Sequence, residues 1–185
     1  MHVFLGDLNG ETTDNFQTQI NADAINLLGG NANGDGVAAY GNNDHVTLGT
    51  GIGDGINIGS GLNNVTATVL GAHALFQGGN LSNNVTLTDK AGSSTFVIGL
   101  ANSETIHLGG SDNNTINIQA DGKNTATIDG VSKTDIVHFA DGFANATITT
   151  ASGHTTVAFA SGQTVTLTGV HDAATFGPDP SIHYI

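Results

Sequence analysis

The sequence predicts an all-β fold, a parallel β-solenoid (β-roll or β-helix) with coils of about 20 residues and two short strands in each coil. Three observations predict this fold class: apolar–x–apolar triplets return about every ten residues, clusters of Gly and Asn separate them, and no proline precedes Pro178. A triplet is too short for a helix face and has the alternation of a strand with one buried side.

The triplets follow one another at a nearly constant step. In order, they begin at Val46, Ile56, Val65, Ala74, Val85, Phe96, Ile106, Ile116, Ala126, Val137, Ala146, Val157 and Val165. Between them lie segments such as Gly61-Leu-Asn-Asn64, which predict turns because Gly and Asn tolerate positive φ. One short strand cannot bury its apolar side alone, so successive coils must stack. A conventional β-sandwich is the alternative, but it does not require so constant a step.

The pattern divides the chain into three parts. Residues 1–22 are expected to cap one end of the stack, residues 23–170 to form the solenoid repeats, and residues 171–185 to form a C-terminal cap or tail, because solenoid ends expose unpaired strand edges. Alternatively, the chain is an excised module whose ends continue into a longer protein. Stacking on another copy is also open, as an end-to-end or side-by-side homo-oligomer.

Composition excludes several classes of function. The formal net charge is −13, and the sequence contains three Lys and no Arg. Nucleic acid is therefore not an expected partner, because too few cations are present to neutralise its phosphates. No run approaches the roughly 18 apolar residues of a membrane span, so membrane insertion is not expected. There is no Cys for a disulfide or a thiolate, and the N-terminal residues show no classical signal peptide.

Residues 109–117 and 78–86 each begin with Gly-Gly and have an apolar residue at the eighth position. Near the N-terminus, Asp is followed two residues later by an apolar residue three times, beginning at Asp35, Asp44 and Asp54. These turns resemble the calcium-binding repeats of the repeats-in-toxin family, whose nonapeptide reads G-G-x-G-x-D-x-U-x, where U is an apolar residue. The chain departs from the family in its ten-residue step and in the Asn residues that replace Asp in later coils. The resemblance implies secretion without a cleaved leader, and hence an extracellular or cell-surface location.

The same resemblance implies calcium in the N-terminal coils. Calcium requires about six to eight oxygen ligands, with carboxylates among them. The candidate ligands are Asp35, Asp44, Asp54 and Asp112, with Asp35 and Asp54 on one edge of the solenoid and Asp44 on the other. The alternative is that these Asp residues cap turns, and that Asn residues of later coils form a neutral hydrogen-bonded ladder.

Outward positions on one face predict a flat grid of Thr and Asn. The residues at the centre of each triplet are expected to align as Thr47, Thr66, Thr86, His107, Thr127, Thr147 and Thr166. The candidate contact residues are Thr47, Asn64, Thr66, Thr68, Asn84, Thr86, Thr88, Thr125, Thr127, Asn145, Thr147, Thr149, Thr164 and Thr166. The grid resembles the T-x-T ranks of ice-binding solenoids, although Thr also suits any exposed strand.

No catalytic motif is present: there is no H-E-x-x-H, no G-x-S-x-G and no P-loop. The sequence therefore predicts a non-enzymatic, secreted structural or adhesive module of a surface or matrix, with calcium as its one candidate cofactor. An ice-binding or polysaccharide-binding module is the alternative. A fragment of a polysaccharide lyase or epimerase is less favoured, because such enzymes need a cation to stabilise an enolate.

Overall fold

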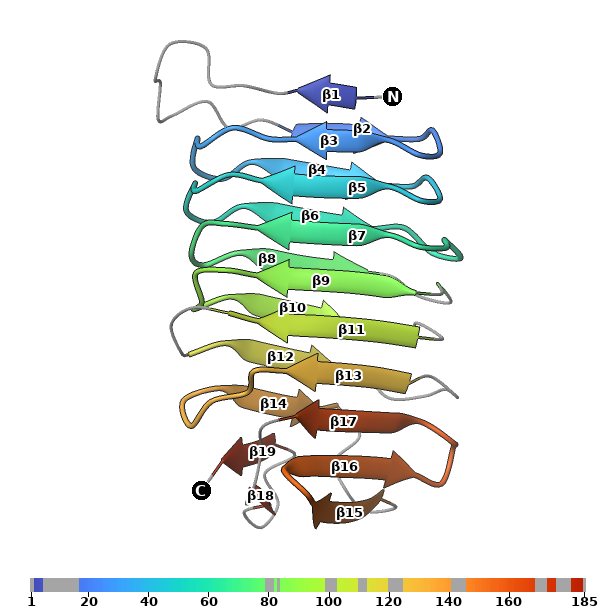
Figure 1. Ribbon diagram of the computed structural model, residues 1–185, viewed down its shortest axis with the longest axis vertical. Helices are drawn as coiled ribbons and strands as arrows, with labels where there is room; N and C mark the ends of the chain where they lie inside the picture. The colour runs from blue at the N-terminus through green and yellow to red at the C-terminus, as the bar shows by residue number, and fades with distance from the viewer. Residues whose placement is uncertain are drawn as a thin grey trace.

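The computed structural model confirms the all-β solenoid. It describes residues 2–4, 17–78, 82, 84–98, 103–109, 113–119, 125–140, 146–168, 173–175 and 181–184. From β2 to β14 the chain alternates between two sheets, which stack back to back into a rod (Figure 1). No helix of the described part is long and apolar enough to cross a membrane.

The two sheets contain ten and nine strands. In spatial order, sheet A consists of β1 (His2–Phe4), β3 (Asn26–Leu28), β5 (His45–Leu48), β7 (Thr66–Val69), β9 (Val85–Asp89), β11 (Ser103–Leu108), β13 (Thr125–Asp129), β17 (Thr164–Thr168), β16 (His154–Phe159) and β15 (Ala146–Ala151). Sheet B consists of β18 (Ala173–Thr175), β19 (Ser181–Tyr184), β14 (Ile136–Phe139), β12 (Thr115–Ile118), β10 (Thr95–Ile98), β8 (Leu75–Gly78), β6 (Gly55–Ile58), β4 (Gly36–Ala39) and β2 (Gln17–Ile20).

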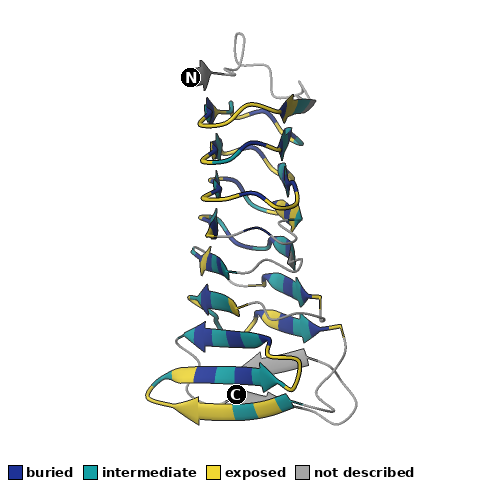
Figure 2. Cartoon of the chain, turned by 90° about the vertical axis from the view of Figure 1, so that its right-hand side faces the viewer, coloured by how far each residue is buried: buried dark blue, intermediate teal, exposed yellow. Residues whose placement is uncertain are grey.

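The core lies between the sheets and is built from columns of inward side chains, one from each coil. Burial alternates along the strands, as Figure 2 shows. In sheet B, Ile56, Phe76, Phe96 and Ile116 follow one another in register and are all buried. The rings of Phe76 and Phe96 stack with centroids 4.6 Å apart and planes 2° from parallel. A single coil cannot bury its apolar side chains, so each coil is stabilised by packing against its neighbours.

Ladders of amide side chains join the turns that precede the strands of sheet A. Asn43, Asn64 and Asn84 have φ values of 59°, 58° and 54°. The Asn64 amide nitrogen donates to Asn43 Oδ1 at 2.9 Å, and the Asn84 amide nitrogen donates to Asn64 Oδ1 at 3.0 Å. Asn tolerates this left-handed backbone, and each side chain gains a partner one coil away. Amide side chains therefore pair from coil to coil, but this ladder is not formed by the Asn residues that replace Asp in the sequence pattern. Asn63, which the pattern places at an Asp position, donates instead to Asn42 Oδ1 at 3.1 Å.

The first position of this ladder is occupied by Ala24, whose φ is also 59°. We expect Ala24→Asn to raise the free energy of unfolding by about 1 kcal/mol, since Asn relieves left-handed strain and can pair with Asn43. Urea unfolding measures the change. Ala24→Gly is the matched control, because it relieves the strain without supplying an amide. A destabilised Ala24→Asn variant would contradict the role of the ladder.

The last strands of sheet A do not continue the alternation between sheets. β15, β16 and β17 form an antiparallel meander, and only β17 pairs in parallel with β13. The sequence pattern places the triplets of this region on alternate faces, and this is wrong for Ala158 of β16, which lies in sheet A. The turn between β15 and β16 is the reason: Ser152 and Gly153 both have positive φ, as a tight hairpin requires.

Candidate functional site: the threonine face of sheet A

Seven threonines form one outward column across sheet A. Strand pairing places them in register, in the spatial order Thr66, Thr86, Thr105, Thr127, Thr166, Thr156 and Thr149. A second column, two residues further along each strand, contains Thr47, Thr68 and Thr88. We call these two columns the threonine face. Neighbouring members of a column are separated by the inter-strand spacing of about 4.8 Å.

The register differs from the prediction at three positions. His107 lies beside Thr88 in the second column, so it does not interrupt the first, where Thr105 takes its place. Thr47 pairs with Thr68 rather than with Thr66. Thr147 pairs with Ala158 at the end of the antiparallel meander and leaves the central column. Thr47 is displaced because Val46 pairs with Ala67 instead of Val65. This pairing shifts β5 by two residues relative to β7 and leaves the same face of each strand buried.

The remaining candidates of the predicted grid lie at its margins or outside the described residues. Thr125 and Thr164 pair with each other in a third, short outward column that begins at Ser103. Asn64 and Asn84 belong to the turn ladder and not to the strand face. Asn145 and the predicted metal ligand Asp112 lie outside the described residues.

The three described Asp candidates are buried in turns, where two of them accept backbone hydrogen bonds from the neighbouring coil. Asp44 Oδ1 accepts from Ile25 N at 3.0 Å and its Oδ2 from Gly41 N at 3.1 Å. Asp54 Oδ1 accepts from Asp35 N at 3.0 Å on the opposite edge, as the sequence predicts. Later coils repeat this bond with other side chains: Ser94 Oγ accepts from Ala74 N at 3.0 Å. The carboxylates of Asp44 and Asp54 therefore hold successive coils together.

Asp54 differs from the other two because its Oδ2 is buried and finds no partner. Burial raises the pKa of Asp54 to about 6, while hydrogen bonds from the backbone of Asp35 and Gly34 oppose the rise and the Asp35 carboxyl adds to it. Within the described ranges, no three His, Asp or Glu side chains gather closely enough to hold a metal ion. Calcium binding stays a prediction, and a measurement of metal content in the purified protein tests it.

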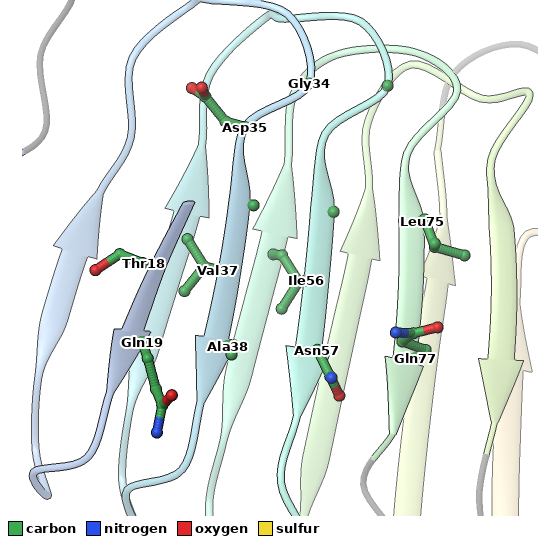
Figure 3. A pocket seen from close by; sticks show the side chains of 13 residues that line it. Thr18, Gln19, Gly34, Asp35, Val37, Ala38, Ile56, Asn57, Leu75 and Gln77 are labelled. Carbon is green, nitrogen blue, oxygen red and sulfur yellow. The ribbon is translucent and has the colours of Figure 1, made fainter. Parts of the chain in front are cut away.

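Asp35 also lies at the margin of a hollow on the outer face of sheet B, on the opposite side of the solenoid from the threonine face (Figure 3). The hollow has a volume of about 550 Å³. Residues of β2, β4, β6 and β8 line it, together with residues of the turns before β4 and β6. The sequence shows no comparable order on this face, because its outward residues vary from coil to coil.

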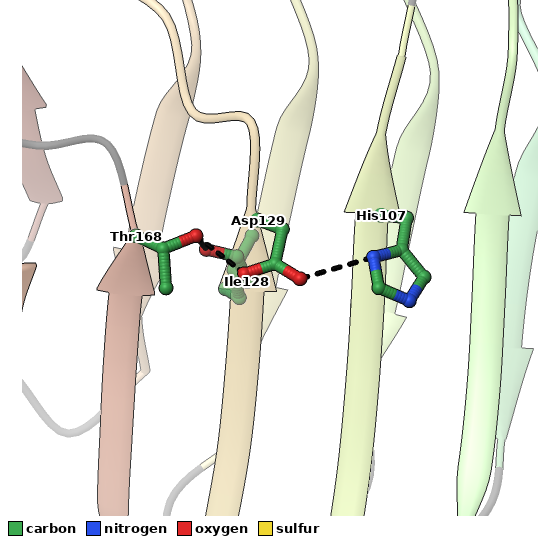
Figure 4. A network of polar contacts seen from close by, with 4 residues as sticks. All are labelled: His107, Ile128, Asp129 and Thr168. Carbon is green, nitrogen blue, oxygen red and sulfur yellow. Dashed lines mark hydrogen bonds and ion pairs between the residues drawn. The ribbon is translucent and has the colours of Figure 1, made fainter.

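A polar network that the sequence does not reveal lies beside the threonine face (Figure 4). His107 Nδ1 lies 3.0 Å from Asp129 Oδ2, and Thr168 Oγ1 donates to Asp129 Oδ1. The side chains of His107 and Asp129 are 46% and 39% exposed, so solvent weakens the attraction between them. Only the register could have shown this contact, because the two residues come from successive coils.

Glu104 is an acidic residue buried in the apolar core. It points inward from β11, in register with Val85 and Ala126, and is only 4% exposed. Its Oε2 has no hydrogen-bond partner, and burial raises the pKa of Glu104 to about 8. A carboxyl group in such surroundings is neutral at pH 7, which is the less costly state for a buried acid.

Comparisons of the chain with protein-family models, with curated proteins and with solved structures find no match. The likeness to repeats-in-toxin modules therefore stays a hypothesis that rests on the residues of the turns, and the threonine face has to be interpreted from its own geometry.

Proposed function

We propose that this protein is a non-enzymatic contact module that lays its threonine face along a repetitive, uncharged surface, in a structural or adhesive role outside the cell. The observation that carries the proposal is the column of seven threonines in register across sheet A. A packed sheet needs no such uniformity on its outer face, where polar residues of many kinds are tolerated.

The chemistry of the face favours an uncharged partner. Thr presents a hydroxyl group, which both donates and accepts, beside a methyl group, and its branched side chain loses little conformational freedom on contact. From β3 to β13, the described positions of the two columns that are not Thr hold Asn26, Leu28, His45, His107 and Asp129. A large uncharged surface with regularly spaced hydroxyl groups, such as an insoluble polysaccharide of a matrix, matches the threonines.

Thr86→Tyr tests the proposal because a bulky ring would stand above the middle of the face. We expect it to weaken binding to insoluble cellulose or chitin, measured by co-sedimentation, at least about tenfold. The ring would hold the polysaccharide away from several neighbouring threonines. The matched control is Thr115→Tyr, an outward Thr on β12 of the opposite sheet. Equal binding by wild type and Thr86→Tyr, or equal loss in both variants, would contradict contact through this face.

Ice is the second candidate surface, because the threonine hydroxyl groups are regularly spaced both along the strands and across them. The ranks Thr66-Ala-Thr68 and Thr86-Leu-Thr88 place hydroxyl groups about 6.6 Å apart along a strand, and columns repeat them about every 4.8 Å. In Figure 2 the upper strands are seen end-on, whereas β15–β17 are seen broadside, so the sheet twists below the region of these ranks. Ice-crystal shaping by wild type that Thr86→Tyr abolishes and Thr115→Tyr retains would support this candidate.

A further inference from the structure

We propose that the hollow on the outer face of sheet B is a second binding site, which takes a short, uncharged oligosaccharide. The site lies over β2, β4, β6 and β8, whereas the threonine face belongs to sheet A. Its volume of about 550 Å³ is in the range of small-ligand sites in proteins. The inference is independent of the proposed function, because the two surfaces share no residue.

Two strand glycines, Gly36 and Gly55, lie on the floor of the hollow, and at Gly55 the fold does not require glycine. Gly36 and Gly55 pair in register and face outward. Gly55 does not have a positive φ, and a Cβ there would meet only the Leu75 carbonyl oxygen, at an ordinary 3.8 Å. By contrast, a Cβ on Gly51 would lie 1.8 Å from the Ala32 carbonyl oxygen. Gly36 and Gly55 begin β4 and β6, and a glycine within a strand often marks a place where a ligand approaches the backbone closely.

Three amide side chains lie in one column along one side of this floor, with Ala38 between the first and the second. Gln19, Ala38, Asn57 and Gln77 occupy one outward column of four successive strands, as Figure 3 shows. Among the described residues, the side chains of Asn57 and Gln77 make no hydrogen bond. Each amide offers donors and an acceptor together, which is the combination that recognises neighbouring hydroxyl groups.

The remaining lining selects against a charged ligand. Among the described residues that line the hollow, Asp35 alone is charged, and it is 4% exposed. No cation stands among those described lining residues to bind a carboxylate or a phosphate. Leu75 is 39% exposed at the margin and offers an apolar surface for the C–H face of a sugar ring. The column of amide side chains extends over three inter-strand spacings, about 14 Å, which suits a short chain of linked sugars better than a single one.

The experiment is a titration with neutral hexasaccharides of β-1,4-linked glucose, xylose and N-acetylglucosamine, followed by calorimetry and by backbone amide NMR shifts. We expect at least one of them to bind, with shifts centred on Gly36 and Gly55. Asn57→Ala and Gln77→Ala should each weaken binding about five- to tenfold, the equivalent of one lost hydrogen bond. Gly55→Thr should abolish binding without lowering the melting temperature, because a Cβ fits there and Thr favours strands.

Two controls separate this site from the rest of the molecule. Asn117→Ala alters the same outward column two strands beyond Gln77, outside the hollow, and should leave the dissociation constant unchanged. Thr86→Tyr should also leave it unchanged, so failure of the threonine-face proposal would not affect the result. Binding of no neutral hexasaccharide, tighter binding of oligogalacturonate, or undiminished binding by Gly55→Thr would overturn the inference.

Discussion

Phe96→Ala is expected to lower the free energy of unfolding by about 3–5 kcal/mol, the range found when a buried aromatic side chain is truncated. Phe96 is fully buried in the middle of the solenoid, stacked on Phe76 and in register with Ile116. In a stack of coils each repeat contacts only its neighbours, so a cavity at this point weakens both of the interfaces that hold the centre of the rod.

Urea unfolding followed by circular dichroism measures this loss. Thr95→Ala is the matched control, because Thr95 is the outward neighbour on the same strand and its truncation should cost less than about 0.5 kcal/mol. Phe96→Leu, which keeps most of the apolar volume, should fall between the two. A loss below about 1 kcal/mol for Phe96→Ala would show that the two sheets are not packed against each other as described.

Glu104→Gln is expected to remove a large part of the pH dependence of stability. Burial raises the pKa of Glu104 from 4.5 to about 8, so the folded chain keeps a proton that the unfolded chain releases. Stability is therefore fully present below pH 4.5 and falls as the pH rises toward 8. The slope is at most about 1.4 kcal/mol per pH unit. Gln supplies a neutral side chain of the same shape, and its variant should be more stable than wild type at pH 8.

Thermal and urea unfolding between pH 4 and pH 9 separate Glu104 from the other buried acid with a large shift. Burial raises the pKa of Asp54 to about 6, so Asp54→Asn should flatten the profile mainly below pH 6. Glu104→Gln should flatten it over the whole interval from pH 4.5 to pH 8, and between pH 6 and pH 8 it should be the variant with the larger effect. If wild type and Glu104→Gln lose stability in parallel over that upper interval, Glu104 is not a buried neutral acid.

Much of the fold follows from local pattern, whereas the register does not. The segment Val65-Thr-Ala-Thr-Val69 alternates over five residues, so a triplet beginning at Val65 and one beginning at Ala67 fit the ten-residue step equally well. The structure pairs Val46 with Ala67. Similarly, the sequence pattern places Glu104 in a turn, because an acidic residue is not expected in the core. In the structure Glu104 points into the core from β11, and its neighbour Thr105 therefore faces outward in the threonine column.

The candidate sites show the same division. The sequence assigns Asp35, Asp44 and Asp54 to their edges correctly, because an acid next to glycine at a constant step marks a turn. The hollow on sheet B could not be predicted. It depends on Gly36 and Gly55 lying side by side in neighbouring coils, and neither glycine is distinguishable in the sequence from the many glycines of the turns.

By itself, the sequence determined that this protein is a stack of short parallel strands with polar turns, because period-two alternation and a constant step are local properties. Only the tertiary structure decided which residues meet across coils. Bonded positions of successive coils are separated by 19, 20 or 21 residues, so a constant step cannot predict pairing. A two-residue shift preserves the buried face and is invisible in the pattern, yet it determines which threonines share a column and which histidine contacts Asp129.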